Sequence, residues 1–309
     1  MAKTTSYILI ALAAITLAAP AAAWAASSGA DKEVPRSNTF GGDCAKCELS
    51  GRRLRNAHFM NANFSGAILV GSDLREAHFL TSTFAGADLT RADLSDSQIV
   101  RVDFSNANLS HAKLRDTQAV GSVFSEANLS GADLSDASAQ MANFTQAQLI
   151  GAVFHSTDMT GANLTRVTAH NADFRDATLR LAVLTNGRFE KASFRSAELD
   201  MATLTGANFD GADFKDASMH HAMIGGADLS RARGLSQDQI DEACGDSRTR
   251  LPKGLSTKPC TVNVQAIIRQ SINRRLLPAG SAPPAPPAPP APPAPPSPYN
   301  RYLVAIPSS

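Results

Sequence analysis

Four cysteines are the residues of this chain with the clearest capacity for chemistry. Cys44 and Cys47 form a Cys-x-x-Cys motif, and Cys244 and Cys260 lie far along the chain. A Cys-x-x-Cys pair can exchange disulfides, supply half of a metal site or close a small disulfide. Glu48 follows the motif where covalent haem attachment needs a histidine, which excludes that chemistry. The motif leaves three alternatives open: a capping disulfide or buried thiols, redox work, and a metal site.

Histidines are the second set of residues with chemical potential. His58 and His78 are 20 residues apart, and His220 and His221 are adjacent. Two histidines without a third ligand more often sit as ordinary surface residues than as a metal site. The sequence has no nucleophile motif and no glycine-rich phosphate loop. We therefore expect a protein that is not an enzyme and that uses no metal or cofactor.

A repeat of five residues fills the chain between these groups. Every fifth residue from Leu49 to Leu229 gives 37 positions, of which 17 are Leu and 13 are Phe, and the residue two places earlier is Ala at 26 of them. A period of five fits neither a helix of 3.6 residues per turn nor a strand with alternating faces. A short extended step followed by a corner fits it, and repetition of that unit builds a solenoid around one interior column.

The large residues of the repeat also sort into columns at a spacing of 20. One column holds Phe from Phe64 to Phe144 and then aliphatic residues, and another holds Leu first and Phe from Phe154 to Phe214. Stacked four-sided coils require such ladders of matched side chains. Proline is absent from the repeats, so the backbone donors stay available for bonds between coils.

The repeat resembles that of the pentapeptide-repeat family, whose unit is A(D/N)LXX, as in Ala87-Asp88-Leu89 and Ala162-Asn163-Leu164. This resemblance covers about Cys47 to Ala232. It implies an all-β solenoid, a right-handed quadrilateral β-helix with four pentapeptides per coil. The 37 units then make about nine coils, and a spacing of about 4.8 Å gives a rod roughly 43 Å long. Family members that protect DNA gyrase by mimicking DNA imply one alternative function, a topoisomerase-interacting protein.

Charge weighs against that alternative. The chain has 29 basic and 28 acidic residues, and residues 47–233 have 17 basic and 21 acidic ones. A net charge of −4 over the whole repeat region is too weak to imitate the phosphate density of DNA, and it gives no reason to expect nucleic-acid binding. The chain after Gly234 carries +4, so this basic C-terminal region is the part suited to contact anionic surfaces.

The first and last segments of the chain differ in composition from the repeats. Residues 1–25 hold a lysine, an apolar run and an Ala-Trp-Ala site, typical of a secretory signal peptide of an exported bacterial protein, with a retained anchor as the alternative. We therefore expect a periplasmic or secreted protein. Residues 281–298 form an Ala/Pro-rich linker that favours polyproline II, and residues 299–309 form a terminal tail that either docks or frays.

Two cap regions are predicted at the ends of the repeats. Residues 26–46 form an N-terminal cap segment, residues 47–233 the β-helix itself, and residues 234–280 a C-terminal cap. A capping box from Ser236 to Gln239 predicts a short helix that covers the last coil.

The C-terminal cap holds two further predicted features. Cys244 and Cys260 are expected to pair in an oxidising compartment. Residues 263–278 form an amphipathic segment that either folds back on the rod or contacts an anionic surface.

An apolar stripe departs from the polar outer positions of the repeats. Met60, Leu80, Val100 and Val120 occupy one outward position in successive coils. Three explanations stay open: an interface with a second copy or another partner, scattered apolar groups on a narrow rod, or a surface covered by the C-terminal segment. The leading functional hypothesis is a non-enzymatic, exported structural or protein-binding scaffold in the bacterial envelope, whose partner is an unidentified protein or envelope component. Its alternatives are the DNA mimic and a Cys-x-x-Cys redox protein.

Overall fold

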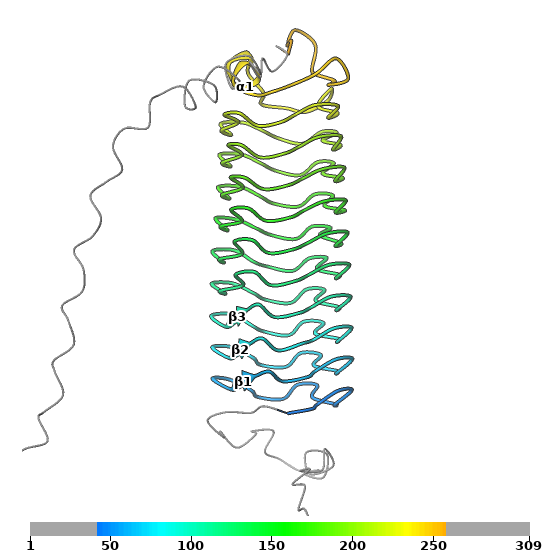
Figure 1. Ribbon diagram of the computed structural model, residues 1–309, viewed down its shortest axis with the longest axis vertical. Helices are drawn as coiled ribbons and strands as arrows, with labels where there is room; N and C mark the ends of the chain where they lie inside the picture. The colour runs from blue at the N-terminus through cyan, green and yellow to red at the C-terminus, as the bar shows by residue number, and fades with distance from the viewer. Residues whose placement is uncertain (1–41, 258–309) are drawn as a thin grey trace, which may run out of the picture. The chain divides into compact units, whose positions relative to one another are not determined.

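The computed structural model describes residues 42–257, which form a rod of stacked coils (Figure 1). Several predicted features fall on residues 1–41 and 258–309 and so lie outside the described residues. These are the signal peptide, most of the N-terminal cap segment, Cys260, the amphipathic segment over 263–278, the Ala/Pro-rich linker and the terminal tail.

The coils repeat every 20 residues. Parallel bridges along one side lead from Asp43 to Met223 in nine successive 20-residue steps, and three further ladders run along the other sides. The predicted four-sided β-helix is therefore confirmed. Stacking starts at Asp43 rather than at residue 47, and it continues beyond the repeats through the bridges Met223–Cys244 and Asp228–Arg250.

Few coils contain more than a single bridged residue on each side. The described strands are β1 (His58–Met60), β2 (His78–Leu80) and β3 (Gln98–Val100), which form one parallel sheet in that order near the N-terminal end of the rod (Figure 1). One described helix, α1 (Gln237–Glu242), lies at the other end. The rest of the rod consists of short extended steps separated by corners.

Corners place every fifth residue in the left-handed backbone region. From Lys46 to Gly226 each such residue has a positive φ, and only 11 of these residues are glycine. A backbone hydrogen bond closes a typical corner, for example from Ala57 N–H to the carbonyl oxygen of Leu54 at 3.2 Å. The corner residues also bond to the next coil, as when Asn56 N–H donates to the carbonyl of Arg75 at 3.0 Å. These bonds hold the corner residues in a backbone conformation that L-residues otherwise avoid.

The Asp or Asn of the repeat has a local role at each corner. Its side-chain oxygen accepts a hydrogen bond from the backbone N–H two residues later. Asp88 Oδ1 accepts from Thr90 N–H at 3.0 Å, and Asn163 Oδ1 accepts from Thr165 N–H at 3.0 Å. This turn uses a donor that points away from the neighbouring coils, which explains why short polar side chains recur at this position.

Stacked phenylalanines fill much of the interior. Phe104 and Phe124 lie with ring centroids 5.1 Å apart and planes 2° apart, and Phe124 and Phe144 lie 4.9 Å apart. The second predicted column is equally regular, with Phe174 and Phe194 at 5.0 Å. All of these rings are fully buried. The core is thus one continuous column whose rings face their own counterparts in the next coil.

Helix α1 covers the last coil. Ser236 and Gln239 form the predicted capping box, and Ile240 is fully buried. The Nε2 of Gln239 donates to the carbonyl oxygens of Phe214 at 3.0 Å and Ala217 at 2.7 Å. The Phe214 carbonyl also accepts the corner bond from Ala217 N–H, whereas the Ala217 carbonyl occupies the position that accepts from the next coil elsewhere in the rod. The cap therefore satisfies an acceptor that a further coil would otherwise use.

Candidate functional site

The predicted apolar stripe lies where the three strands end. Met60, Leu80 and Val100 are the last residues of β1, β2 and β3 and lie directly beside one another in the parallel register. Met60 and Leu80 are each 44% exposed, Val120 is 37% exposed, and Val100 is partly buried. The structure therefore brings all four predicted residues to one surface line.

A shallow groove accompanies the stripe. It has a volume of about 200 Å³ and is lined by outward side chains at both ends of the three strands. His58 and His78 stack on its other side with ring centroids 4.4 Å apart, and His78 Nδ1 lies 3.1 Å from Gln98 Oε1. The groove thus has an apolar wall and a polar wall, which lie at the two ends of the three-residue strands.

A buried serine accounts for the length of β1, which has three paired residues where most sides of the rod have a single bridged residue. The N–H of Ala62 does not close the usual corner bond but donates to Ser82 Oγ, one coil further along, at 3.1 Å. Ser82 Oγ in turn donates to the carbonyl oxygen of Phe59 at 3.4 Å. The inserted hydroxyl opens the corner, and His58–Met60 becomes a three-residue strand.

The apolar surface continues beyond the predicted stripe. Met141, Leu181 and Met201 are 76%, 54% and 44% exposed. They occupy the residue next to the stripe position at the same corner of later coils, so they extend the line towards the C-terminal end. We call these three residues, with Met60, Leu80, Val100 and Val120, the apolar corner. It holds six of the nine exposed large hydrophobic side chains among residues 42–257.

Sequence reasoning missed the second half of the apolar corner because its residues are offset by one position. The stripe follows residues 60, 80, 100 and 120, whereas the continuation follows residues 141, 181 and 201. The signal was present in the sequence, since a scan of the neighbouring column of 20 would have found two methionines and a leucine. Both columns belong to the same corner in the structure.

The side of the rod that follows the apolar corner is almost free of charge. It presents residues 63 and 65 and their equivalents at each step of 20 up to 223 and 225, and Asp103 is the one charged residue among these 18. We call it the neutral face. The opposite side, with residues 53 and 55 and their equivalents up to 213 and 215, has 13 charged residues among 18. We call it the charged face.

Ion pairs compensate the charged face internally. Three of its arginines pair with aspartates of the same face: Arg75 with Asp73 at 2.7 Å, Arg175 with Asp173 at 2.6 Å, and Arg195 with Asp213 at 3.3 Å. The Arg75 guanidinium holds the pKa of Asp73 below its ordinary value. Both signs alternate along the rod, so this face does not project the field of one sign that a nucleic acid or its mimic carries.

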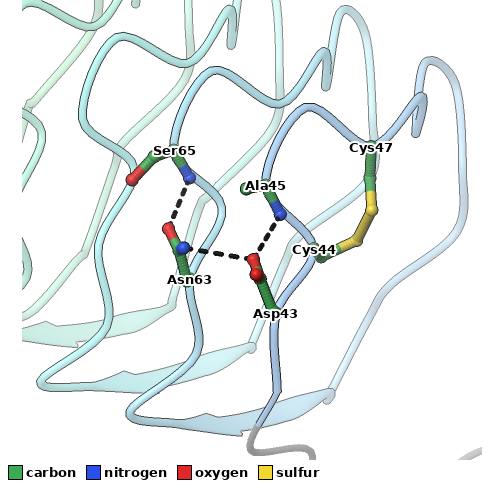
Figure 2. Close-up of a disulfide and its surroundings, with 6 residues drawn as sticks. All are labelled: Asp43, Cys44, Ala45, Cys47, Asn63 and Ser65. Carbon is green, nitrogen blue, oxygen red and sulfur yellow. Dashed lines mark hydrogen bonds between the residues drawn. A yellow bond between two sulfur atoms is a disulfide. The ribbon is translucent and has the colours of Figure 1, made fainter. Parts of the chain in front are cut away.

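The Cys44–Cys47 pair closes the N-terminal end of the rod. The two residues form a disulfide with their Cα atoms 5.2 Å apart (Figure 2). Beside it, Asp43 Oδ1 accepts from Ala45 N–H at 2.9 Å and from Asn63 Nδ2 at 3.1 Å. In this state neither sulfur is a thiolate that could exchange or bind a metal.

The cysteines and histidines are not brought together into one site. Cys244 is also a disulfide cysteine and lies in the last coil, at the other end of the rod from Cys44. His220 Nδ1 lies 3.2 Å from Asp200 Oδ1, and its Nε2 lies 3.3 Å from Glu242 Oε2 at the end of α1. Within residues 42–257 no group of three or more His, Cys, Asp or Glu residues has an arrangement that could hold a metal ion. None of the helices in this range has the length and apolar character to cross a membrane.

The family of the chain follows from a comparison with known protein families. The model described as pentapeptide repeats matches in eight copies that together span residues 43–233. The chain belongs to the pentapeptide repeat family. Pentapeptide repeat proteins fold as right-handed quadrilateral β-helices and are generally not enzymes. A comparison with curated proteins found no match.

Several solved pentapeptide repeat structures are similar to this chain, and one of them shares its fold. HetL, from the cyanobacterium Nostoc, which is involved in the regulation of heterocyst differentiation, is 27% identical, with a TM-score of 0.61 over 69% of this chain and 93% of its own. A pentapeptide repeat protein from the thylakoid lumen of Arabidopsis thaliana is 33% identical over 34% of this chain and 70% of its own, with a TM-score of 0.27. QnrB1, a plasmid-mediated fluoroquinolone resistance protein, is 20% identical over 75% of this chain and 93% of its own, with a TM-score of 0.24.

Proposed function

We propose that this pentapeptide repeat protein is a non-enzymatic, exported scaffold that binds protein along its apolar corner. One observation carries the proposal: six of the nine exposed large hydrophobic side chains among residues 42–257 gather on one line along the rod. Contiguous apolar patches on soluble proteins mark interaction sites. Covering a half-exposed Met or Leu contributes about 1 kcal/mol, so the six exposed side chains of the line together contribute about 6 kcal/mol to binding.

Export is supported by two independent features. The composition of residues 1–25 is that of a secretory signal peptide. The Cys44–Cys47 disulfide and the disulfide-bonded state of Cys244 are typical of an oxidising compartment. In the periplasm or outside the cell, the basic region after Gly234 would in addition face anionic envelope surfaces.

The two alternative functions have less support. A DNA mimic needs a dense field of negative charge, but the charged face alternates basic and acidic residues and pairs them internally. A redox role needs a cysteine pair that becomes a nucleophilic thiolate. Cys44 is buried at 6% exposure and already closes a turn with Cys47.

Site-specific photocrosslinking in cells tests the proposal. A photoreactive residue at Leu80 should form an adduct with protein, and the adduct should be recovered in the periplasmic or secreted fraction. The matched control is the same residue at Lys113, which is 63% exposed on the charged face and should form none. Equal yields from both positions, or adducts confined to the cytosolic fraction, would contradict the proposal.

A further inference from the structure

We infer that the apolar corner binds a second copy of the chain, so that two rods lie antiparallel in a two-fold symmetric dimer. This inference rests on the proposed function, because it names the protein partner of the same surface. A linear surface along a straight rod is self-complementary in the way that a two-fold interface requires.

The one-residue offset within the apolar corner fits this symmetry. A two-fold axis between the coils of Val120 and Met141 brings the first half of one rod level with the second half of the other. Four levels then pair Met60 with the partner's Met201, Leu80 with the partner's Leu181, Val100 with the partner's Gly161, and Val120 with the partner's Met141.

Each level of this dimer receives apolar side chains that do not collide. At each level one rod contributes the residue at the stripe position and the other rod contributes the residue after it. The two side chains therefore project from opposite edges of the line where the rods meet, which we call the seam, and lie side by side. The third level, in which Val100 faces a glycine, receives a large side chain from one rod only. Gly161 carries no side chain there, and Met141 Cγ lies over it, 3.8 Å from the place a Cβ would take.

Charge selects the antiparallel arrangement over the parallel one. In a parallel dimer Arg101, Arg180 and Asp200 would each lie level with its own copy, and like charges across an interface are unfavourable. In the antiparallel dimer the same three residues lie level with uncharged ones: Thr160 of the partner subunit, Thr81 of the partner subunit and Asn61 of the partner subunit. No ion at the seam then meets a like charge at its own level.

The available area meets the need of a stable dimer. A rod of roughly 43 Å and a side of five residues, about 16 Å wide, present about 700 Å² per protomer. Two protomers together would bury about 1,400 Å², within the range of specific complexes. This area is that of a whole side, so it includes the neutral face, which adjoins the apolar corner and presents Ser, Thr and Asn side chains with almost no charge, while the charged face remains in water.

The oligomeric state of the purified full chain tests the inference. Light scattering or sedimentation at 1–100 μM should give twice the chain mass, and Leu80→Asp/Leu181→Asp should weaken association about 100-fold or more. The matched control is Ile68→Asp/Ile150→Asp, since these side chains are 40% and 42% exposed but lie off the corner. This control should remain a dimer. A monomeric wild-type chain at 100 μM would overturn the inference.

Disulfide crosslinking tests the direction of the rods. A mixture of the Leu80→Cys and Leu181→Cys variants should crosslink, whereas each variant alone should not, because its own copies lie several coils apart. Crosslinking of Leu80→Cys alone would indicate parallel rods and overturn the antiparallel arrangement. If the purified chain is a monomer but Leu80 crosslinks to a different protein in cells, the dimer fails and the proposed function stands.

Discussion

Ser122 Oγ accepts a hydrogen bond from the backbone N–H of Val102 at 3.2 Å, one coil away. The same hydroxyl donates to the carbonyl oxygen of Ile99. These are the two groups that would bond directly in an ordinary corner, so the serine stands between them and holds the corner open. Ser82 does the same for β1, and the surface groove lies over β1, the serine-bridged β3 and the strand between them.

Replacing Ser122 by Ala should lower the free energy of unfolding by about 1–2 kcal/mol. The change leaves the Val102 N–H and the Ile99 carbonyl without their buried partner unless the corner closes. Guanidinium unfolding of the purified protein measures the loss.

Ser97→Ala is the matched control for this change. Ser97 is fully buried at an equivalent small position, but its Oγ has no hydrogen-bond partner. Removing it should leave stability unchanged or raise it, since an unsatisfied buried hydroxyl is unfavourable. Equal losses for the two variants would show that the bridging bonds contribute nothing.

Ser196→Gly should stabilise the rod. Ser196 is an exposed corner residue with a φ of 56°, where a side chain crowds its own backbone. Glycine removes that strain, although it also loses more entropy on folding, so we expect a net gain of about 0.5–1 kcal/mol. Ser196→Ala retains the Cβ and should show no gain, and a gain in both variants would mean that the strain is not its source. Thermal unfolding compares the two.

Acid should weaken the charged face through Asp73. Arg75 donates to both carboxylate oxygens of Asp73, at 2.8 and 2.7 Å, and these bonds keep the folded-state pKa of Asp73 below its unfolded value. The unfolded chain therefore binds the proton more readily. The stabilisation is complete well above the ordinary aspartate pKa of about 3.9 and is lost as the pH falls below it.

The Asp73→Asn variant isolates this contribution. It should have a lower melting temperature than the wild type at pH 7 and a smaller decrease between pH 7 and pH 3. Melting curves at both pH values measure the difference. If the decrease is the same in both proteins, Asp73 does not contribute to acid sensitivity.

Cys44→Leu/Cys47→Ala should still fold. The variant restores the large and small residues that the repeat places at these two positions. Loss of a disulfide that closes so short a loop lowers stability by at most about 2 kcal/mol in the chain-entropy model. The backbone bond from Cys47 N–H to the Cys44 carbonyl, at 3.1 Å, already closes the same turn. Circular dichroism without reductant should show an intact β-helix, and an unfolded variant would assign the disulfide an essential role.

The fold was predictable because each pentapeptide has the same pattern, a small residue followed two places later by a large apolar one. Thirteen phenylalanines occupy positions that differ by multiples of five residues, and a solenoid buries all of them in one interior. The columns at a spacing of 20 residues indicate four sides. The capping helix was equally visible, since Ser236 and Gln239 make a local motif. Such features depend on periodicity and on neighbours in the chain, which a sequence states directly.

The candidate site was only half predictable, for two physical reasons. Met141, Leu181 and Met201 lie next to the stripe position rather than on it, and only the geometry of a corner makes the two columns one surface. Ser82 is visible as a serine in an alanine position, but its hydroxyl also has an acceptor in its own coil, the Leu80 carbonyl oxygen at 3.4 Å. Its insertion into the preceding coil depends on the distance between two coils, which the sequence does not state.

The 20-residue register has a consequence for how proteins of this architecture change in length. Each coil presents to the next the same donors and acceptors that it receives from the one before, from Asp43 to Met223. A duplication of 20 residues would therefore lengthen the rod by about 4.8 Å and leave the contacts on either side intact. An insertion within the coils that is not a multiple of 20 residues would instead shift every column beyond it. The length of the rod therefore changes in whole coils, and the position of the dimer axis would move with each added coil.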